Sequence, residues 1–225
     1  MQTSPRCVGI ILDGNRRWAK ERGLPTAEGH RQGAKSTDVI ALAARDLGIE
    51  HLALYAFSTE NWKRSGEEVS YLMELFEEAI RDHFSRLTEE GIRVRFVGQL
   101  ERFSDTLRTL MREVEAKNPA ELKMTLWVCL SYGGQAEIVE AARALATAGE
   151  EITEESLAQH LWTAQMPDPD LIIRTGGEHR LSNFLLWKSA YSELFFPGAL
   201  WPAFTKVDLE NILEEYATRE RRLGK

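Results

Sequence analysis

The strongest constraint on the fold is a regular alternation between short apolar segments and longer segments with helical periodicity. The apolar segments, each of a length suited to a β-strand, cover residues 7–12, 51–57, 92–97, 124–130, 170–174 and 194–196. The helical patterns cover residues 35–47, 67–87, 104–117, 135–148, 153–162 and 206–219. This alternation predicts an α/β fold, with a central, mostly parallel six-stranded sheet flanked by helices and covered on both faces.

Several helix ends are marked by residues that stop or start helical structure. Gly48 and Gly91 each follow a predicted helix, where glycine commonly ends one. Thr153 is a suitable N-cap for the helix that it begins, because its hydroxyl can accept a bond from a backbone amide. We find no repeat, low-complexity segment or linker, so residues 1–225 are expected to form a single domain.

Composition excludes several classes of protein. The net charge of −7 argues against a general nucleic-acid binder, because such proteins are usually basic. Cys7 and Cys129 both lie in apolar segments, so we expect buried free thiols in a reducing compartment and no metal framework built on cysteine. The chain shows no signal peptide and no uninterrupted apolar stretch of ~18 residues, which predicts a cytoplasmic protein without a membrane span.

Polar side chains follow four of the predicted strands, at the point where each strand ends. The segments are 13–17 (DGNRR), 58–64 (STENWKR), 131–134 (SYGG) and 174–183 (RTGGEHRLSN). In a parallel sheet they share one edge, where ligands bind beyond the carboxyl ends of the strands. The planar guanidinium of arginine can donate two hydrogen bonds to one phosphate, and loop amides also bind phosphate oxygens. A carboxylate beside them can hold a Mg²⁺ ion that bridges it to the phosphate. The edge is therefore predicted to bind an anionic ligand with a divalent cation.

Each of these residues also has a structural interpretation. Asp13 alone is more typical of a helix N-cap, and Arg174 and Arg180 are equally typical of surface charges or structural ion pairs. The glycine pairs at 133–134 and 176–177 are more often turns than phosphate-binding loops. The convergence of four such segments on one predicted edge favours the functional interpretation.

Two common phosphate-binding motifs and one hydrolase motif are absent or incomplete. No G-x-G-x-x-G follows the first strand, and no G-x-S-x-G occurs. Residues 29–36 (GHRQGAKS) approach a P-loop, but Ala34 separates the second glycine from Lys35 and no strand precedes them. Ser182 lies near His179, but two residues of one loop are not a catalytic triad. A nucleotide-driven enzyme is therefore only a weak alternative.

Seven motifs resemble those of one known family. They are DGNRRWAK (13–20), EGHRQGAKS (28–36), LYAFSTENWKR (54–64), SYGG (131–134), DLIIRTGGEHRLSNFLLW (170–187), YSELFF (191–196) and RERRLG (219–224). In this order they are similar to the motifs of the cis-prenyltransferases, above all those of the bacterial undecaprenyl diphosphate synthase type. The resemblance runs from about residue 7 to the last residues, and the 13–20 and 170–187 motifs are highly specific together.

The resemblance implies a Mg²⁺-dependent transferase that condenses isopentenyl diphosphate onto an allylic diphosphate such as farnesyl diphosphate. The implied product is a cis-polyprenyl diphosphate, the undecaprenyl-type lipid carrier precursor for cell-wall synthesis. A synthase of shorter chains and a catalytically weak isoprenoid-binding partner subunit remain as alternatives. Negative charge that develops on the departing diphosphate needs oriented donors and cations, which the predicted edge supplies.

The resemblance also implies roles for single residues. Asp13 is expected to place Mg²⁺ and to be essential for catalysis, with Glu193 as a second carboxylate at the metal. Asn61 is a candidate for proton handling, although a neutral amide is a poor base and a substrate phosphate or a relay serves equally well. The residues expected to bind substrate are Gly14, Asn15, Arg16, Arg17, Trp18, His30, Ser58, Trp62, Arg64, Glu68, Arg174, Arg180, Ser182, Arg222 and Gly224.

These substrate-binding residues fall into groups. By resemblance, the loop 14–17 and His30 hold the allylic diphosphate, whereas Arg174, Arg180 and Ser182 hold isopentenyl diphosphate. The segment 58–68 matches a mobile part of the family that orders the substrate. Arg16 has no separate task within its group.

A hydrophobic tunnel between the sheet and the helices is implied for the growing chain. The expected lining residues on the 67–87 pattern are Leu72, Met73, Phe76, Ala79, Ile80 and Phe84. Burial of each methylene group contributes ~0.8 kcal/mol, so tunnel length and plugging side chains are expected to set product length. Trp127 either narrows this tunnel or belongs to the core.

The resemblance further implies a homodimer, in which the tail 219–225 reaches the partner's diphosphate site through Arg222 and Gly224. Release of a lipid product implies transient contact with the membrane surface, at its inner face. Three positions depart from the family pattern: Thr26 replaces a frequent arginine, Ser65 a proline and Ala203 an aspartate. These departures bear on affinity and on the choice of allylic substrate more than on activity.

Overall fold

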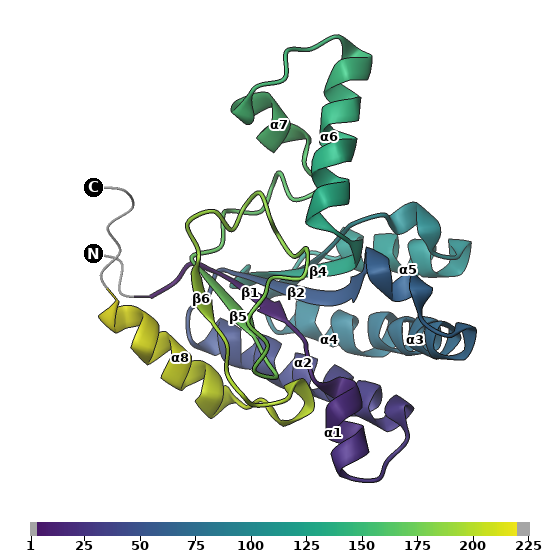
Figure 1. The fold of residues 1–225 in the computed structure, drawn as a ribbon, viewed down its shortest axis with the longest axis vertical. Helices are drawn as coiled ribbons and strands as arrows, with labels where there is room; N and C mark the ends of the chain where they lie inside the picture. The colour runs from purple at the N-terminus through teal and green to yellow at the C-terminus, as the bar shows by residue number, and fades with distance from the viewer. Residues whose placement is uncertain (1–3, 220–225) are drawn as a thin grey trace.

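A six-stranded sheet in which all neighbouring strands are parallel forms the centre of the molecule (Figure 1). In the computed structural model, which describes residues 4–219, the strand order is β3-β4-β2-β1-β5-β6. The strands are β1 (Cys7–Ile11), β2 (His51–Ser58), β3 (Ile92–Val97), β4 (Met124–Tyr132), β5 (Leu171–Arg174) and β6 (Glu193–Phe195). The predicted six-stranded sheet is confirmed, and it is entirely rather than mostly parallel.

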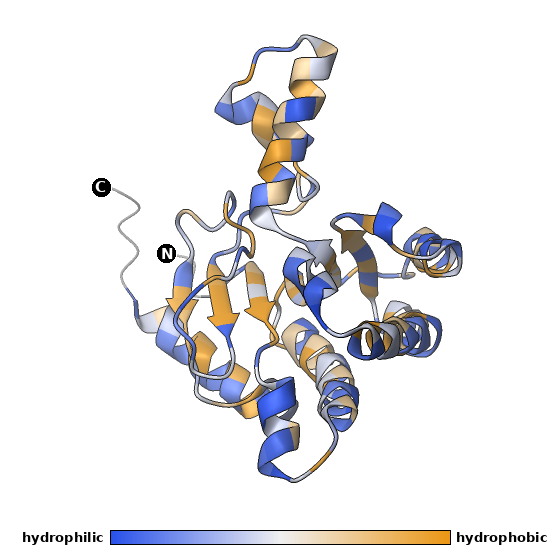
Figure 2. Ribbon diagram, turned by 45° about the vertical axis from the view of Figure 1, so that its right-hand side comes forward, coloured by the Kyte–Doolittle hydropathy of each residue, from blue (hydrophilic) through white to orange (hydrophobic). Residues whose placement is uncertain are grey.

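The interior strands are apolar on both faces because both faces are covered. Every residue of β1, β4 and β5 is buried, as expected for a parallel sheet. Side chains alternate between the faces, so Val8 and Ile10 of β1 enter one hydrophobic cluster while Cys7 and Ile11 enter another. Figure 2 shows the central strands as largely hydrophobic ribbons among helices of mixed polarity.

Helices cover the first of these faces. Their apolar stripes pack in one cluster with Val8 and Ile10 of β1. They are α2 (Thr26–Asp46), α3 (Gly66–Glu78), α4 (Phe84–Glu89), α5 (Asp105–Ala116) and α8 (Lys206–Thr218). This face therefore holds the larger part of the core.

Three helical elements differ from expectation. Helix α2 begins nine residues before the predicted start at residue 35. The predicted helix 67–87 is interrupted by a π-helical segment, η2 (Ala79–His83), between α3 and α4. Helix α1 (Asn15–Glu21) was not predicted, because its largely charged sequence NRRWAKE shows no apolar periodicity.

Loops cover much of the second face. Its cluster joins Tyr55 and Trp127 from the strands to Phe184 and Leu185, which lie between β5 and β6. The cover expected on both faces is thus supplied here largely by loops rather than by helices. Trp127 lies on this face, opposite to α3, so its side chain belongs to the core and not to a tunnel beside α3.

The remaining helices and the cysteines match expectation. Helices α6 (Gly134–Ala148) and α7 (Glu154–His160) pack against each other and project from the body (Figure 1). Thr153 caps α7, accepting a hydrogen bond at its Oγ1 from a backbone amide. Cys7 and Cys129 are buried and free, and burial raises the pKa of both thiols. None of the helices within residues 4–219 combines the length and the apolar content that a membrane crossing requires.

Candidate active site

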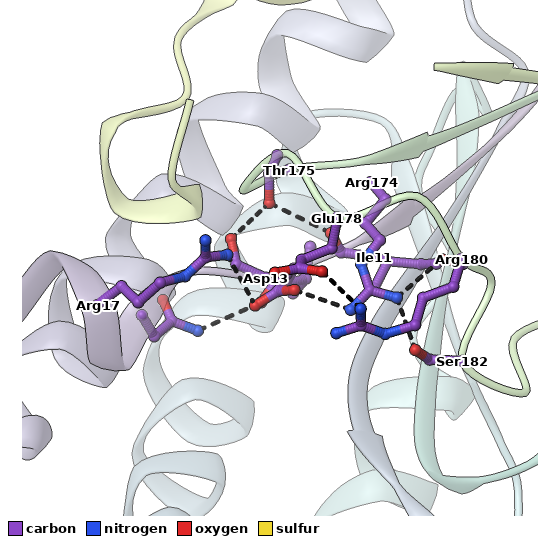
Figure 3. A network of polar contacts seen from close by, with 10 residues as sticks. Ile11, Asp13, Arg17, Arg174, Thr175, Glu178, Arg180 and Ser182 are labelled. Atoms are coloured by element: carbon purple, nitrogen blue, oxygen red, sulfur yellow. Dashed lines mark hydrogen bonds and ion pairs between the residues drawn. The ribbon is translucent and has the colours of Figure 1, made fainter. Parts of the chain in front are cut away.

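The chain turns sharply after β1, at Asp13 and Gly14. Gly14 has a φ of 117°, which favours glycine, and a Cβ here would lie 2.9 Å from the backbone of Leu200. Gly14 is the N-cap of α1, so the interpretation of Asp13 as a helix cap is wrong. The Asp13 carboxylate lies instead among arginines at the edge of the sheet (Figure 3).

Two arginines approach this carboxylate from different elements (Figure 3). Arg174, the last residue of β5, donates from Nη2 to Oδ2 of Asp13 at 2.8 Å. Arg17 of α1 places its Nη2 3.5 Å from Oδ1. Because β1 and β5 are neighbours with Ile11 opposite Arg174, their register brings the two segments together. The expected meeting of segments 13–17 and 174–183 is therefore present in the structure.

The loop after β5 holds Arg174 in place. Arg174 is only 5% exposed, and its Nη1 donates to Oγ of Ser182 at 2.6 Å and to the backbone oxygen of Arg180 at 2.7 Å. The Arg180 side chain is 57% exposed and is bonded to Glu178. Arg174 is therefore fixed before any ligand binds, whereas Arg180 has room to reorient toward an anion.

Sequence reasoning missed several residues around Asp13. Thr175 is fully buried and donates from Oγ1 to the Asp13 carbonyl oxygen at 2.7 Å. The amide of Trp201 donates to the same oxygen at 2.9 Å. Glu60 accepts from Nδ2 of Asn183 at 3.0 Å beside the larger polar cavity described next. Thr175, Glu60 and Asn183 lie inside segments that the sequence had singled out, but nothing in the sequence linked Trp201 to Asp13.

Asp13 lies where two polar cavities meet. The larger has a volume of about 620 Å³ and the smaller of about 360 Å³. Among the predicted site residues, both cavities contact Asp13, Asn15, His30 and Arg64. The larger adds Ser58, Asn61, Arg174, Arg180 and Ser182, and the smaller adds Gly14, Arg16 and Arg17. Three of the four predicted segments thus line one continuous polar region, and the SYGG segment does not.

A buried histidine connects this region to α3. Nε2 of His30 lies 3.3 Å from Oε1 of Glu68, which also accepts from Nη1 of Arg64 at 2.9 Å. Burial lowers the pKa of His30, and the contact with Glu68 does not offset it. Burial alone would raise the pKa of Glu68, but Arg64 and His30 lower it further than burial raises it. Near neutral pH the contact is therefore a hydrogen bond between a neutral imidazole and a carboxylate.

The segment after β2 forms a 3-10 turn, η1 (Thr59–Lys63). Its side chains point in two directions, some toward the larger polar cavity and one toward the core. Asn61 lines the larger cavity, and its Oδ1 accepts from the amide of Ser58 at 3.1 Å. Trp62 turns away from both polar cavities, and its Nε1 donates to Oγ of Ser131 at 2.9 Å. Trp62 therefore anchors the turn to the core, while Ser58 and Asn61 face the cavity.

The glycines that approached a P-loop form a helix-packing surface instead. Gly29 and Gly33 lie one turn apart on α2, where α1 begins beside it. A Cβ on Gly29 would lie 2.1 Å from the backbone oxygen of Asn15, and one on Gly33 would lie 2.2 Å from its Oδ1. The missing side chains let α1 lie directly against α2, which fixes Asn15 beside the cavities.

An apolar cavity of about 90 Å³ adjoins the polar region, between the sheet and helices α2 and α3. It shares His30, Leu72 and Asn15 with the larger polar cavity. The expected tunnel residues that line it are Leu72, Phe76, Ala79, Ile80 and Phe84, whereas Met73 does not. The arrangement suits an amphiphile with an anionic head at Asp13 and an apolar tail along α3.

Glu193 lies apart from the polar region. It begins β6 opposite Leu171, the first residue of β5, whereas Arg174 ends β5. Its carboxylate accepts from Nη1 of Arg219 at 2.7 Å, beside the end of α8. Within one chain, therefore, Glu193 does not join Asp13 at a shared metal position.

Other predicted site residues also lie outside the cavities or beyond the described structure, and Glu68 reaches the polar region only through its contacts with His30 and Arg64. Trp18 lines none of the cavities, and the guanidinium carbon of Arg22 lies 4.3 Å from the centre of its ring. Arg222 and Gly224 lie outside the described residues. Their predicted roles in substrate binding remain predictions.

The donors at Asp13 fit a magnesium ion that the substrate helps to bind. Within residues 4–219, no group of three or more His, Cys, Asp or Glu side chains is placed to hold a metal ion. Mg²⁺ commonly takes one or two carboxylates and completes its shell with waters and substrate phosphates. Asp13 provides one carboxylate open to both cavities, and the arginines beside it suit the phosphates.

Comparisons with known proteins agree with this geometry. Residues 11–224 match the family described as "Putative undecaprenyl diphosphate synthase". The chain is 47% identical to an isoprenyl transferase of Thermotoga maritima, over 98% of this chain and 97% of that protein. It is 46% identical to the ditrans,polycis-undecaprenyl-diphosphate synthase ((2E,6E)-farnesyl-diphosphate specific) of Pseudomonas aeruginosa, over 98% and 91%. Lavandulyl diphosphate synthase from Lavandula x intermedia, solved with dimethylallyl diphosphate, superimposes with a TM-score of 0.95 at 36% identity over 100% of both chains.

Proposed function

Because this chain belongs to the undecaprenyl diphosphate synthase family of isoprenyl transferases, we propose that it condenses isopentenyl diphosphate onto an allylic diphosphate such as farnesyl diphosphate, with Mg²⁺ as cofactor. The product is then a cis-polyprenyl diphosphate of the undecaprenyl type, the precursor of a lipid carrier for cell-wall synthesis. The observation that carries the proposal is the position of Asp13, where two polar cavities meet beside an apolar one.

The smaller polar cavity suits the allylic diphosphate. Arg16 and Arg17 supply positive charge there, and the turn at Gly14 brings backbone close to the ligand. Asn15 and His30 line this cavity and the apolar one alike, so the tail of the same substrate enters the apolar cavity. The dimethylallyl diphosphate bound by the similar lavandulyl diphosphate synthase supports an allylic ligand on this fold.

The larger polar cavity suits isopentenyl diphosphate. Arg174 and Ser182 form a fixed wall, and the exposed Arg180 can turn toward the diphosphate. Ser58 and Asn61 line the same cavity from the turn after β2. Both substrates then meet at Asp13, which converts a reaction between two free molecules into a reaction between oriented neighbours.

The reaction requires charge stabilisation where the allylic C–O bond breaks. Negative charge develops on the departing diphosphate while the double bond of isopentenyl diphosphate attacks the allylic carbon, and a proton is then lost. Arg17 and Arg64 line the smaller cavity and stabilise the developing charge. When bound, Mg²⁺ adds positive charge at the leaving group, with Asp13 as its protein ligand. A substrate phosphate takes the proton, with Asn61 as a positioning residue, since a neutral amide is a poor base.

The assembly that we propose is a homodimer on the inner face of the cytoplasmic membrane. The tail 219–225 then brings Arg222 and Gly224 to the partner's diphosphate site. Glu193, which holds Arg219 at the start of that tail, serves the partner's metal rather than the Asp13 of its own chain. Transient contact with the membrane surface releases the lipid product.

The test incubates the purified protein with Mg²⁺, farnesyl diphosphate and labelled isopentenyl diphosphate, and then sizes the products. Asp13→Ala is expected to lower turnover by roughly 10²- to 10³-fold or more, since it removes the carboxylate at the leaving group. Glu21→Ala, an exposed acid on α1, is the matched control and should leave turnover unchanged. Full turnover in Asp13→Ala would contradict the assigned role.

The same assay decides between the proposed function and its alternatives. Short products would favour a shorter-chain synthase. No elongation from any allylic primer, from geranyl to geranylgeranyl diphosphate, would favour a catalytically weak partner subunit. The intact set of Asp13, Arg174 and Arg180 around one cavity favours the active enzyme.

A further inference from the structure

A hydrogen-bonded histidine–aspartate pair lines the apolar cavity. The described titratable residues that line this cavity are His30, Asp38 and His83, and of these only His30 also lines the polar cavities that contain Asp13. Nδ1 of His83 lies 2.5 Å from Oδ2 of Asp38. The two side chains are 26% and 27% exposed, and both line the cavity.

This pair is distant from the diphosphate-binding region. Asp38 follows His30 by eight residues along α2, which corresponds to about 12 Å at the rise of a helix. His83 follows Leu72 by eleven residues along α3 and η2, which corresponds to about 16 Å. His30 and Leu72 line the larger polar cavity as well. Asp38 and His83 therefore join α2 to η2 at the distal end of the apolar cavity.

The π-helical segment η2 sets the direction of His83. A π-helical turn contains an extra residue, which changes the angle of the side chains that follow it, and such turns occur frequently at functional sites. Ala79, Ile80 and His83 of this segment all line the cavity. An uninterrupted α-helix would direct His83 elsewhere, so the interruption of the predicted helix coincides with the distal wall.

We propose that the Asp38–His83 pair closes the distal end of the apolar cavity and limits the length of the prenyl chain that the enzyme makes. This inference rests on the proposed function. A growing chain that reaches the pair can extend further only if α2 and η2 separate. Separation breaks a hydrogen bond between ionisable groups and brings hydrocarbon against them, and both changes are unfavourable. The pair determines specificity and does not contact the reacting atoms.

The experiment measures product length and the first condensation separately. Asp38→Ala/His83→Ala removes both side chains, and we expect its main product to be longer by one or more isoprene units. The rate of the first condensation onto farnesyl diphosphate should stay within about twofold of the parent, because the reacting atoms are remote. His83→Ala alone, a milder change, should shift product length in the same direction. Asp38→Asn, which retains an acceptor of similar size, should preserve the parent's product length.

A second ion pair on the same helical stretch provides the matched control. Arg81 donates to Glu77 at 2.6 Å, and neither residue lines the cavity. Glu77→Ala/Arg81→Ala should leave product length unchanged.

Two results would overturn the role of the Asp38–His83 pair. The first is unchanged product length in both folded alanine variants. The second is longer products in the Glu77→Ala/Arg81→Ala control, since general loosening of α3 would then suffice. Absence of any product from the parent protein would instead contradict the proposed function, and this inference with it.

Discussion

The two arginines that contact the Asp13 carboxylate, Arg174 and Arg17, differ in how firmly the surrounding structure holds them. The Arg174 side chain is 6% exposed and makes three hydrogen bonds, one of them to Asp13. The Arg17 side chain is 44% exposed, and its nearest nitrogen lies 3.5 Å from Asp13, longer than an ordinary hydrogen bond of this kind. Arg174 is therefore preorganised, whereas Arg17 is free to adjust.

This difference follows from the elements that carry the two side chains. Arg174 ends a buried strand and is followed by a loop that closes around it, whereas Arg17 lies on a seven-residue helix. A cation fixed in advance costs little reorganisation when charge develops, and a movable one can follow the arrival of a ligand. We infer that Arg174, the fixed side of the carboxylate, orients Asp13. Arg17, the movable side, captures the allylic diphosphate.

Arg174→Lys removes the hydrogen bonds that hold the fixed side, and it is expected to reduce activity more than any substitution on the movable side. Lysine keeps the charge but lacks the planar fork that reaches Asp13, Ser182 and a carbonyl oxygen at once. We expect kcat/KM to fall by about 10²- to 10³-fold in steady-state assays. Arg17→Lys is the matched control, with an expected loss of about fivefold or less, because lysine keeps the positive charge at an exposed position that does not depend on a fixed fork. Equal losses in the two variants would remove the distinction between the sides.

The fixed side could be predicted from the sequence, because neighbouring parallel strands end at the same edge. Asp13 and Arg174 each follow an apolar run, and that was sufficient to bring them together. The position of Glu193 could not be predicted in this way. Its strand has three residues, and so short an apolar run carries no signal for register against β5.

Other features depended on tertiary contacts that no local pattern encodes. The π-helical interruption at 79–83 lies within an apolar stripe that continues with ordinary helical spacing. The buried Thr175 is one hydroxyl among several in its loop. Gly29 and Gly33 resemble loop residues, because glycine is unfavourable inside a helix, and only their contact with Asn15 explains them.

Gly29→Ala tests the movable side, because the new methyl group on α2 should displace α1, the helix that carries Arg17. In an unconstrained helix the change would stabilise by up to ~1 kcal/mol, but the new Cβ would lie 2.1 Å from the Asn15 backbone oxygen. We expect a net loss of about 1–3 kcal/mol in urea unfolding, and a higher KM for the allylic diphosphate with a smaller change in kcat. Gly66→Ala is the control, because no atom lies within 4 Å of its new Cβ. A Gly29→Ala protein as stable as the Gly66→Ala protein would contradict this packing argument.

His30→Gln has the smallest expected effect, and it concerns pH. Burial lowers the pKa of His30 below its ordinary value of 6.5, so unfolding raises that pKa and the unfolded chain binds more protons as the pH falls. The stability that the neutral imidazole contributes is complete above about pH 6.5 and is lost as the pH falls toward the folded-state pKa. The decline in Tm between about pH 7 and 5 should therefore be shallower in His30→Gln than in the parent. Parallel curves of Tm against pH would show that His30, although it lines both polar cavities, does not couple proton binding to folding.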